Sequence, residues 1–325
     1  MLQDSFGRIF KSLRLSVTDR CDLRCTYCMP KEGMTWLPRA DILSYEEMER
    51  LVRVFASMGV QRVRLTGGEP LLRHDLSKLV ALLAKIPGIA DLSLTTNGQR
   101  LAAQAHDLRE AGLHRITVSL DSLDAGRFAA ITRGGDLDKV WQGLERAQWE
   151  GFSPIKLNCV VLPENEADLL PLAALTLERR WEVRFIEAMP VSAALGGSVA
   201  GGISMKVLKA RIVERFGALE EVPTAAHSPA RRFWMPSAVG KLGFIQSVSE
   251  AFCSSCDRLR LSSTGFLQLC MAHPDGVDLK PMLRSGISDA VLARSIQEAV
   301  FRKPAGHSFY KQAPAPTMAM SRIGG

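Results

Sequence analysis

Three cysteines on one short loop constrain this chain more than any other feature of its sequence. Cys21, Cys25 and Cys28 have the spacing C-x3-C-x2-C and directly follow the alternating apolar run LRLSV at 13–17, which predicts a strand. Three thiolates can bind three irons of a [4Fe–4S] cluster and leave the fourth iron open to another ligand. A structural zinc ion would need four protein ligands. The loop therefore predicts an open iron–sulfur cluster, with a zinc site or unligated cysteines as the alternatives.

A second group of three cysteines lies near the other end of the chain. It has the spacing C-x2-C-x13-C and consists of Cys253, Cys256 and Cys270. On spacing alone this group also fits zinc, with His273 as a fourth ligand. Arg258 and Arg260 lie between the cysteines, on one side of an extended segment. Two guanidinium groups in this arrangement suit phosphate, which they bind through charge-assisted hydrogen bonds.

Strand-like and helix-like segments alternate through the first two thirds of the chain. Strands are predicted at 13–17, 63–66, 92–96, 115–120, 155–161 and 183–187. Amphipathic helices are predicted from the Ser44–Glu47 capping box to Gly59, and at 76–85, 101–111, 136–150 and 166–180. About six such units predict an α/β fold, a partial (βα)6 barrel of the TIM type, because a closed barrel has eight. In such folds the chemistry lies at the C-terminal ends of the strands.

The strand–helix pattern ends after a helix predicted at 205–216. Beyond it the chain has several prolines, the second cysteine group and only short strand-like runs. We therefore predict two domains, the barrel at 1–218 and a smaller, irregular α+β domain at 219–325. The small-residue stretch at 193–202 is predicted to be a loop.

Composition and charge limit the classes of partner. The 325 residues are 46% hydrophobic and carry a net charge of +7, with the arginines dispersed along the chain. This favours an anionic small molecule such as a nucleotide over nucleic acid. The apolar runs fall short of the ~20 residues that a membrane span needs, and the N-terminus lacks a signal-peptide pattern. Six of the seven cysteines form the two groups, which favours metal binding in the reducing cytoplasm. Cys159 is predicted to be a buried structural thiol.

Several short motifs resemble those of one enzyme family. In chain order they are SVTDRC-x3-C-x2-C, TGGEP, LTTNG, VSLDSL, RFIE-x-M, FC-x2-C-x-RLRL and a terminal Gly-Gly pair. Together they resemble the GTP 3′,8-cyclase family of radical S-adenosylmethionine (SAM) enzymes, which act first in molybdenum cofactor biosynthesis. The resemblance implies that the open iron binds SAM and that a 5′-deoxyadenosyl radical takes hydrogen from the ribose C3′ of GTP. C3′ would then attack C8 of guanine and give the 3′,8-cyclised nucleotide.

The resemblance also implies roles for individual residues. Two [4Fe–4S] clusters are expected, the first on Cys21, Cys25 and Cys28, and the second, whose open iron meets guanine, on Cys253, Cys256 and Cys270. SAM is expected to contact Tyr27, Gly68, Ser119 and Met189. GTP is expected to contact Arg14, Arg64, Thr95, Lys156, Arg258, Arg260 and the backbone of Leu259. Catalytic roles are implied for Arg258, Arg260, Gly324 and Gly325.

Partners and departures from the family pattern follow from the same resemblance. The product would pass to a cyclic pyranopterin monophosphate synthase, a reductase or flavodoxin would supply electrons, and a homodimer is one expected assembly. Asp22 and Asp257 stand where the family usually has asparagine; both residue types suit turns, so the change concerns local hydrogen bonding. Two other interpretations stay open at this point: a radical SAM peptide maturase with an auxiliary cluster, and a non-catalytic iron–sulfur or zinc protein.

Overall fold

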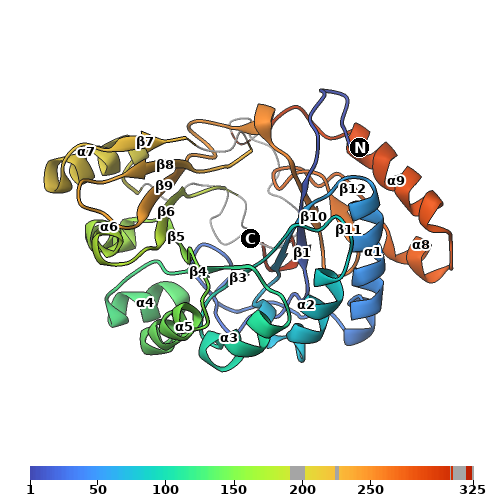
Figure 1. Ribbon diagram of the computed structural model, residues 1–325, viewed down its shortest axis with the longest axis horizontal. Coiled ribbons are helices and arrows are strands. Elements are labelled where there is room, and N and C mark those ends of the chain that lie inside the picture. Colours follow the sequence, from blue (N-terminus) through green and yellow to red (C-terminus); the bar gives the residue numbers. More distant parts are fainter. Residues whose placement is uncertain (191–201, 224–226, 308, 310–319, 324–325) are drawn as a thin grey trace.

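Six parallel strands form the centre of the molecule. The computed structural model describes residues 1–190, 202–223, 227–307, 309 and 320–323. The central strands follow one another in chain order, each hydrogen-bonded to the next (Figure 1). They are β1 (Ser12–Ser16), β2 (Arg62–Thr66), β3 (Asp91–Thr96), β4 (Arg115–Ser119), β5 (Lys156–Val161) and β6 (Glu182–Glu187). Their positions and their parallel pairing confirm the predicted partial barrel.

Helices follow these strands and lie on the outside of the curved sheet (Figure 1). They are α1 (Tyr45–Ser57), α2 (Leu76–Ala84), α3 (Leu101–Glu110), α4 (Ala125–Thr132), α5 (Leu137–Trp149), α6 (Leu169–Glu178) and α7 (Met205–Phe216). The predicted capping box begins α1, since Ser44 and Glu47 exchange hydrogen bonds there. One predicted helix is split, because a 3-10 helix at Pro163–Asp168 precedes α6. Further 3-10 helices occupy Arg39–Asp41, Pro70–Leu72 and Cys253–Ser255.

The C-terminal part of the chain extends the same sheet at both of its edges. Its elements are β7 (Glu220–Val222), β8 (Arg231–Trp234), β9 (Lys241–Ile245), β10 (Arg258–Leu261), β11 (Phe266–Gln268), β12 (Gly276–Asp278), α8 (Lys280–Arg284), α9 (Asp289–Phe301) and α10 (Met320–Ile323). β9 pairs with β6 and β10 pairs with β1, both parallel, whereas the outer strands are antiparallel. The described residues thus form a sheet of twelve strands, in the order β12-β11-β10-β1-β2-β3-β4-β5-β6-β9-β8-β7.

This topology fixes where the second cysteine group lies. The connection from β9 to β10 passes from one edge of the barrel to the other, and it carries two of the three cysteines. The junction between β6 and β9 is part of the core. The ring centroids of Phe185 in β6 and Phe244 in β9 lie 5.8 Å apart, and both side chains are buried. Burial of each such ring contributes about 1.5–3 kcal/mol. The division of the chain between residues 218 and 219 stays a prediction.

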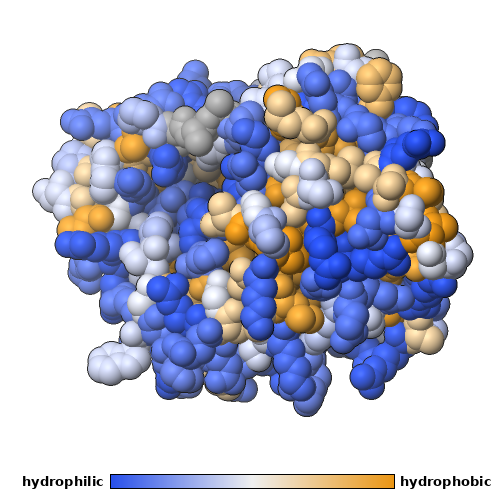
Figure 2. Space-filling view, turned by 45° about the vertical axis from the view of Figure 1, so that its right-hand side comes forward, coloured by the Kyte–Doolittle hydropathy of each residue, from blue (hydrophilic) through white to orange (hydrophobic). Residues whose placement is uncertain are grey.

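Predictions were also made for Cys159, for the loop at 193–202 and for membrane-spanning segments. Cys159 is fully buried within the core, as predicted. The loop predicted at 193–202 lies, apart from Gly202, outside the described residues. In the face of Figure 2, hydrophobic residues gather toward the centre and right among hydrophilic ones. Within the described ranges, no helix combines the length and apolar character that a membrane span requires.

Candidate active site

One cavity of about 570 Å³ lies on the inner side of the barrel. Its wall includes residues from the beginnings of the strands, such as Ser12 and Asp91, and residues that follow their C-terminal ends, such as Gly68. Both cysteine groups also line it. Segments from the two ends of the chain therefore meet in one space.

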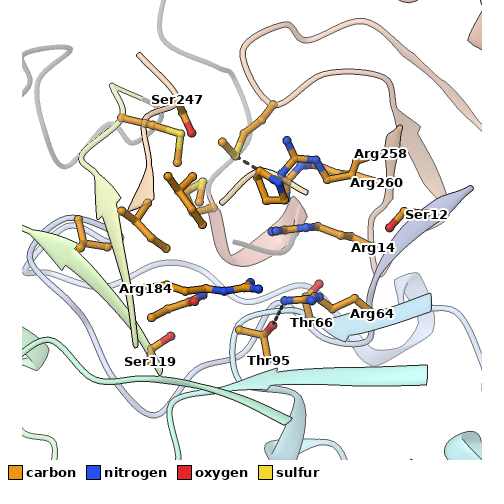
Figure 3. Close-up of a pocket in the computed structure, with 18 of the residues that line it drawn as sticks. Ser12, Arg14, Arg64, Thr66, Thr95, Ser119, Arg184, Ser247, Arg258 and Arg260 are labelled. Carbon is orange, nitrogen blue, oxygen red and sulfur yellow. Dashed lines mark hydrogen bonds between the residues drawn. The ribbon is translucent and has the colours of Figure 1, made fainter. Parts of the chain in front are cut away.

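Arginines from three adjacent strands form a row along this cavity (Figure 3). Arg14 of β1 is the register partner of Arg64 in β2 and of Arg260 in β10. Leu13 and Leu15 alternate with Arg14 and are fully buried, because successive side chains of a strand point to opposite faces. The register therefore directs all three guanidinium groups into the same space.

Two members of this row, Arg14 and Arg64, lack carboxylate partners within the part of the chain that the structure describes. Arg14 and Arg64 form no ion pair there, and Arg64 contacts only the hydroxyls of Thr95 and Thr117, at 3.4 and 3.5 Å. Burial and repulsion from neighbouring arginines lower the pKa of Arg14, and they lower that of Arg64 to about 10. Other cavity arginines do have carboxylate partners, namely Arg62, Arg115 and Arg184. Arg14 and Arg64 would therefore be stabilised by an anion with several charges.

Lys156 and Arg184 extend the positive wall of the cavity. Burial and the charge of Arg184 lower the pKa of Lys156 to about 7, although Glu182 acts to raise it. Arg184 pairs with Glu182 at 2.6 Å. Our sequence analysis missed Arg184. Its signal is the alternation in β6, where Val183 and Phe185 face the core and Arg184 lies between them.

The first cysteine group, Cys21, Cys25 and Cys28, follows β1 and lines the cavity. Burial raises the pKa of Cys21 to about 12 and that of Cys28 to about 11. Such thiols release their protons when metal binds them, because metal binding stabilises the thiolate. The loop is anchored by Tyr27, whose hydroxyl donates a hydrogen bond to Oδ2 of Asp121 at 2.7 Å. Tyr27 also lines the cavity.

Two glycines allow the loop after β2 to pack against the first cysteine loop. Gly67 has a φ of 149°, and a Cβ added to it would lie 2.5 Å from the carbonyl oxygen of Thr18. A Cβ on Gly68 would lie 2.2 Å from the carbonyl oxygen of Arg20. Next to them the carboxyl of Glu69 is buried, which raises its pKa to about 7. Any larger residue at Gly68 would push the two loops apart.

The second cysteine group, Cys253, Cys256 and Cys270, lines the same cavity, with Cys253 and Cys256 just before β10 and Cys270 just after β11. Burial acts to raise the pKa of Cys256, but the charges of Arg258 and Lys303 outweigh it and leave that pKa below its ordinary value. His273 was the candidate fourth zinc ligand. Its Nε2 hydrogen-bonds to the carbonyl oxygen of Gly306 at 3.2 Å, so this nitrogen already has a partner.

Within each group, the three cysteines are too far apart to bind a single metal ion. Among the described residues, no three His, Cys, Asp or Glu side chains are close enough together to hold one metal ion. A four-iron cluster is wider than an ion, and each of its thiolates binds a different iron. The donor set of three cysteines in each group fits such a cluster.

The other predicted site residues fall into three sets. Ser119, Met189 and Thr95 line the cavity, as do Arg258 and Arg260. The side chain of Leu259 is fully buried in the core, so only its backbone can contact a ligand. Gly324 and Gly325 lie outside the described residues, whereas Met320 and Ser321 of α10 line the cavity.

Both aspartates that replace the usual asparagines have cationic partners. Asp22 accepts hydrogen bonds from Asn97 at 2.8 Å and from Arg100 at 3.4 Å. Asp257 is buried and forms an ion pair with Arg62. The change from amide to carboxylate is thus accommodated by local ion pairs.

Comparison with known families agrees with this geometry. The Radical SAM superfamily model matches residues 15–176, and the Molybdenum Cofactor Synthesis C model matches residues 181–309. In fold, the chain is similar to the peptide-bound SuiB of Streptococcus suis, with a TM-score of 0.64 at 14% identity over 92% of this chain and 66% of that one. Methylornithine synthase (PylB) has a TM-score of 0.51 at 19% identity, over 65% of this chain and 63% of its own. The barrel and the three-cysteine loop are those of a radical SAM protein, a class whose cofactors are SAM and a [4Fe–4S] cluster.

The relatives in sequence are closer. The GTP 3′,8-cyclase of Gloeobacter violaceus is 48% identical over 90% of this chain and 91% of its own. Those of Pelotomaculum thermopropionicum and Moorella thermoacetica are each 43% identical over the full length of both chains. The chain therefore belongs to the GTP 3′,8-cyclase family.

Proposed function

We propose that this protein converts GTP to (8S)-3′,8-cyclo-7,8-dihydroguanosine 5′-triphosphate, the first step of molybdenum cofactor biosynthesis. The observation that carries the proposal is the shared cavity, which is lined by two groups of three cysteines and a row of arginines. When bound, the first cluster and SAM supply the 5′-deoxyadenosyl radical that takes hydrogen from the ribose. The protein binds both molecules, orients them and excludes water.

The SAM end of the cavity is the end with the first cysteine group. Gly68, Ser119 and Met189 would contact SAM, and the Tyr27 ring, which Asp121 fixes through its hydroxyl, would border it. Gly68 also packs against the backbone of Arg20, where a Cβ would not fit. These roles follow the family resemblance, and the position of each residue on the cavity wall supports them.

The triphosphate would bind the arginine row. Arg14, Arg64 and Arg260 present guanidinium groups in register, and Lys156 and Arg184 lie on the same wall. Arg258 and the backbone of Leu259 belong to the same set of proposed contacts. Bidentate guanidinium–phosphate bonds would hold the substrate at a fixed depth, so that its base points toward the second cysteine group.

The second cysteine group would hold another [4Fe–4S] cluster, with its open iron toward guanine. Among the residues that the structure describes, no fourth ligand joins the three cysteines, which supports this assignment. The bond between His273 and Gly306 argues against a zinc site completed by His273 Nε2. Gly324 and Gly325, with Arg258 and Arg260, are proposed to act in turnover. Product transfer to cyclic pyranopterin monophosphate synthase, electrons from a reductase or flavodoxin, the homodimer and the two-domain division are also proposals.

Anaerobic turnover tests the proposal directly. The reconstituted protein is given GTP, SAM and a strong reductant, and the mixture is analysed for the cyclised nucleotide and 5′-deoxyadenosine. We expect both products in equal amounts. Cleavage of SAM without any GTP-derived product would contradict GTP as the substrate and would favour the alternative of a peptide substrate. Absence of SAM cleavage in protein with a full iron content would contradict radical chemistry altogether.

A further inference from the structure

Lys303 is a buried lysine for which the proposed mechanism has no role. It follows α9, and only 4% of its surface is exposed. Its ammonium donates hydrogen bonds to the carbonyl oxygen of Leu269 and, at 3.4 Å, to that of Arg258. The ring of Phe10 lies 5.5 Å from the ammonium nitrogen. Lys303 also lines the cavity described above.

A buried ammonium needs a negative partner, because transfer of a charge out of water is costly. Within the described residues, no carboxylate forms an ion pair with Lys303. Burial, together with the charges of Arg8 and Arg258, lowers the pKa of Lys303, and the groups that act against this and favour its charged form are the side chains of Cys256 and Cys270. The partner that the fold supplies to this lysine is therefore the second cysteine group.

Arg8 offers a contrast on the same side of the site. Its guanidinium pairs with Asp4 at 2.6 Å, so its charge is already balanced. It donates hydrogen bonds to the carbonyl oxygens of Cys253 at 2.9 Å and Pro304 at 2.6 Å. Arg8 thus ties the backbone beside Lys303 to the second cysteine loop without adding net charge. Lys303 makes similar backbone contacts, but no carboxylate among the described residues pairs with its ammonium.

The backbone contacts of Lys303 reach two of the three cysteine positions. Leu269 directly precedes Cys270, and Arg258 is two residues beyond Cys256. The ammonium therefore joins the segments that carry these two cysteines, which are separated along the chain by β10 and β11. These two bonds fix the ammonium beside both cysteine-bearing segments.

We propose that Lys303 is the counter-ion of the second cluster: it positions the segments that carry Cys256 and Cys270, and its charge raises the cluster's reduction potential. This rests on the proposed function, which puts a [4Fe–4S] cluster on these cysteines. One-electron reduction adds a negative charge to the cluster, and a fixed cation nearby stabilises the reduced form more than the oxidised form. No substrate is needed for the effect, because Lys303 is part of the folded chain.

The test isolates the second cluster. Cys21, Cys25 and Cys28 are all replaced by Ala, so that any remaining cluster belongs to the second group. This protein and its variants are reconstituted anaerobically without GTP, and iron, sulfide and an EPR-monitored redox titration are measured. The variants are Lys303→Met, which removes the charge, Lys303→Gln, which keeps an amide donor, and Lys303→Arg, which keeps the charge. Lys85→Met, at an exposed position after α2, is the matched control.

We expect Met and Gln at position 303 to make the cluster harder to reduce. The ratio of reduced to oxidised cluster at a fixed potential should fall at least tenfold, which for one electron is a shift of about 59 mV to more negative values. Lys303→Arg should retain most of the original potential, and Lys85→Met should not change it. If Met and Gln abolish cluster binding but Arg preserves it, the need for a counter-ion is supported as well.

Other outcomes distinguish a failure of the second cluster from a failure of the counter-ion role. A parent protein with no four-iron cluster after reconstitution would contradict the second cluster itself, and with it the proposed function of this site. A cluster whose potential is the same with Lys and Met at position 303 would overturn the counter-ion role alone. Loss of the cluster in all three variants, Arg included, would also overturn it, because shape and not charge would then be decisive.

Discussion

The protonation of Lys156 makes GTP affinity dependent on pH in a direction that the structure specifies. In the folded protein the pKa of Lys156 is lowered to about 7, first by burial and then by the charge of Arg184. Above pH 7 the free protein therefore holds a mostly neutral lysine. A bound triphosphate favours the charged form, so it raises this pKa, and binding takes up one proton.

The size of the effect follows from that pKa. The protonated fraction of Lys156 falls roughly twenty-fold between pH 7.5 and pH 9, so the affinity for GTP should fall by about the same factor, near 1.8 kcal/mol. Below pH 7 the lysine is already charged in the free protein, and the affinity should level off. Protonation of the terminal phosphate of GTP does not contribute to this pH dependence above pH 7.5, because its last ionisation lies near pH 6.

Calorimetry of GTP binding to the reconstituted protein measures this effect. Titrations at pH 8.5 in two buffers with different ionisation enthalpies give the number of protons taken up, which should be close to one. Lys156→Met is the control: it should bind GTP more weakly, take up no proton and show a flat profile from pH 7.5 to 9. A Met variant with the same slope as the original protein would refute the reasoning, because another group would then be the one that titrates.

Further outcomes are expected for the clusters, the arginines, Gly68 and the C-terminal glycines. Reconstituted protein should contain about eight irons per chain; replacement of the first cysteine group by Ala should abolish SAM cleavage, and replacement of the second should remove productive GTP binding but spare SAM, as iron analysis and binding assays would show. Arg258→Ala or Arg260→Ala should weaken GTP binding by about 1.5–3 kcal/mol with SAM affinity unchanged; equal losses for both ligands would indicate misfolding. Gly68→Ala should lower the free energy of unfolding by about 1–3 kcal/mol, because its Cβ would meet the preceding cysteine loop; an unchanged denaturation midpoint would contradict this. Deletion of Gly324 and Gly325 should leave both clusters and uncoupled SAM cleavage intact but abolish cyclisation, and normal product formation by the truncated protein would show that these residues are dispensable.

Much of the barrel could be predicted from local patterns. Apolar alternation marked the central strands, and the capping box and helical spacing marked α1, because these signals depend on residues a few positions apart. The two cysteine groups were equally visible, since ligands on one loop have a characteristic spacing. The chemistry of the first group was predicted from the motifs, and the family comparison agrees with it. The cluster on the second group stays a prediction.

What only the tertiary structure decided is which of these segments meet. Alternation in β1 indicates that Arg14 faces away from Leu13, but it does not show that Arg64 and Arg260 stand beside it; that depends on register with strands far along the chain. The same holds for the junction of β9 and β10 with opposite edges of the barrel, and for Lys303 beside the second cysteine group. A local pattern determines the face on which a side chain lies. Its neighbours are determined by hydrogen bonds and packing between distant segments, and the burial and pKa values of the site residues depend on those neighbours.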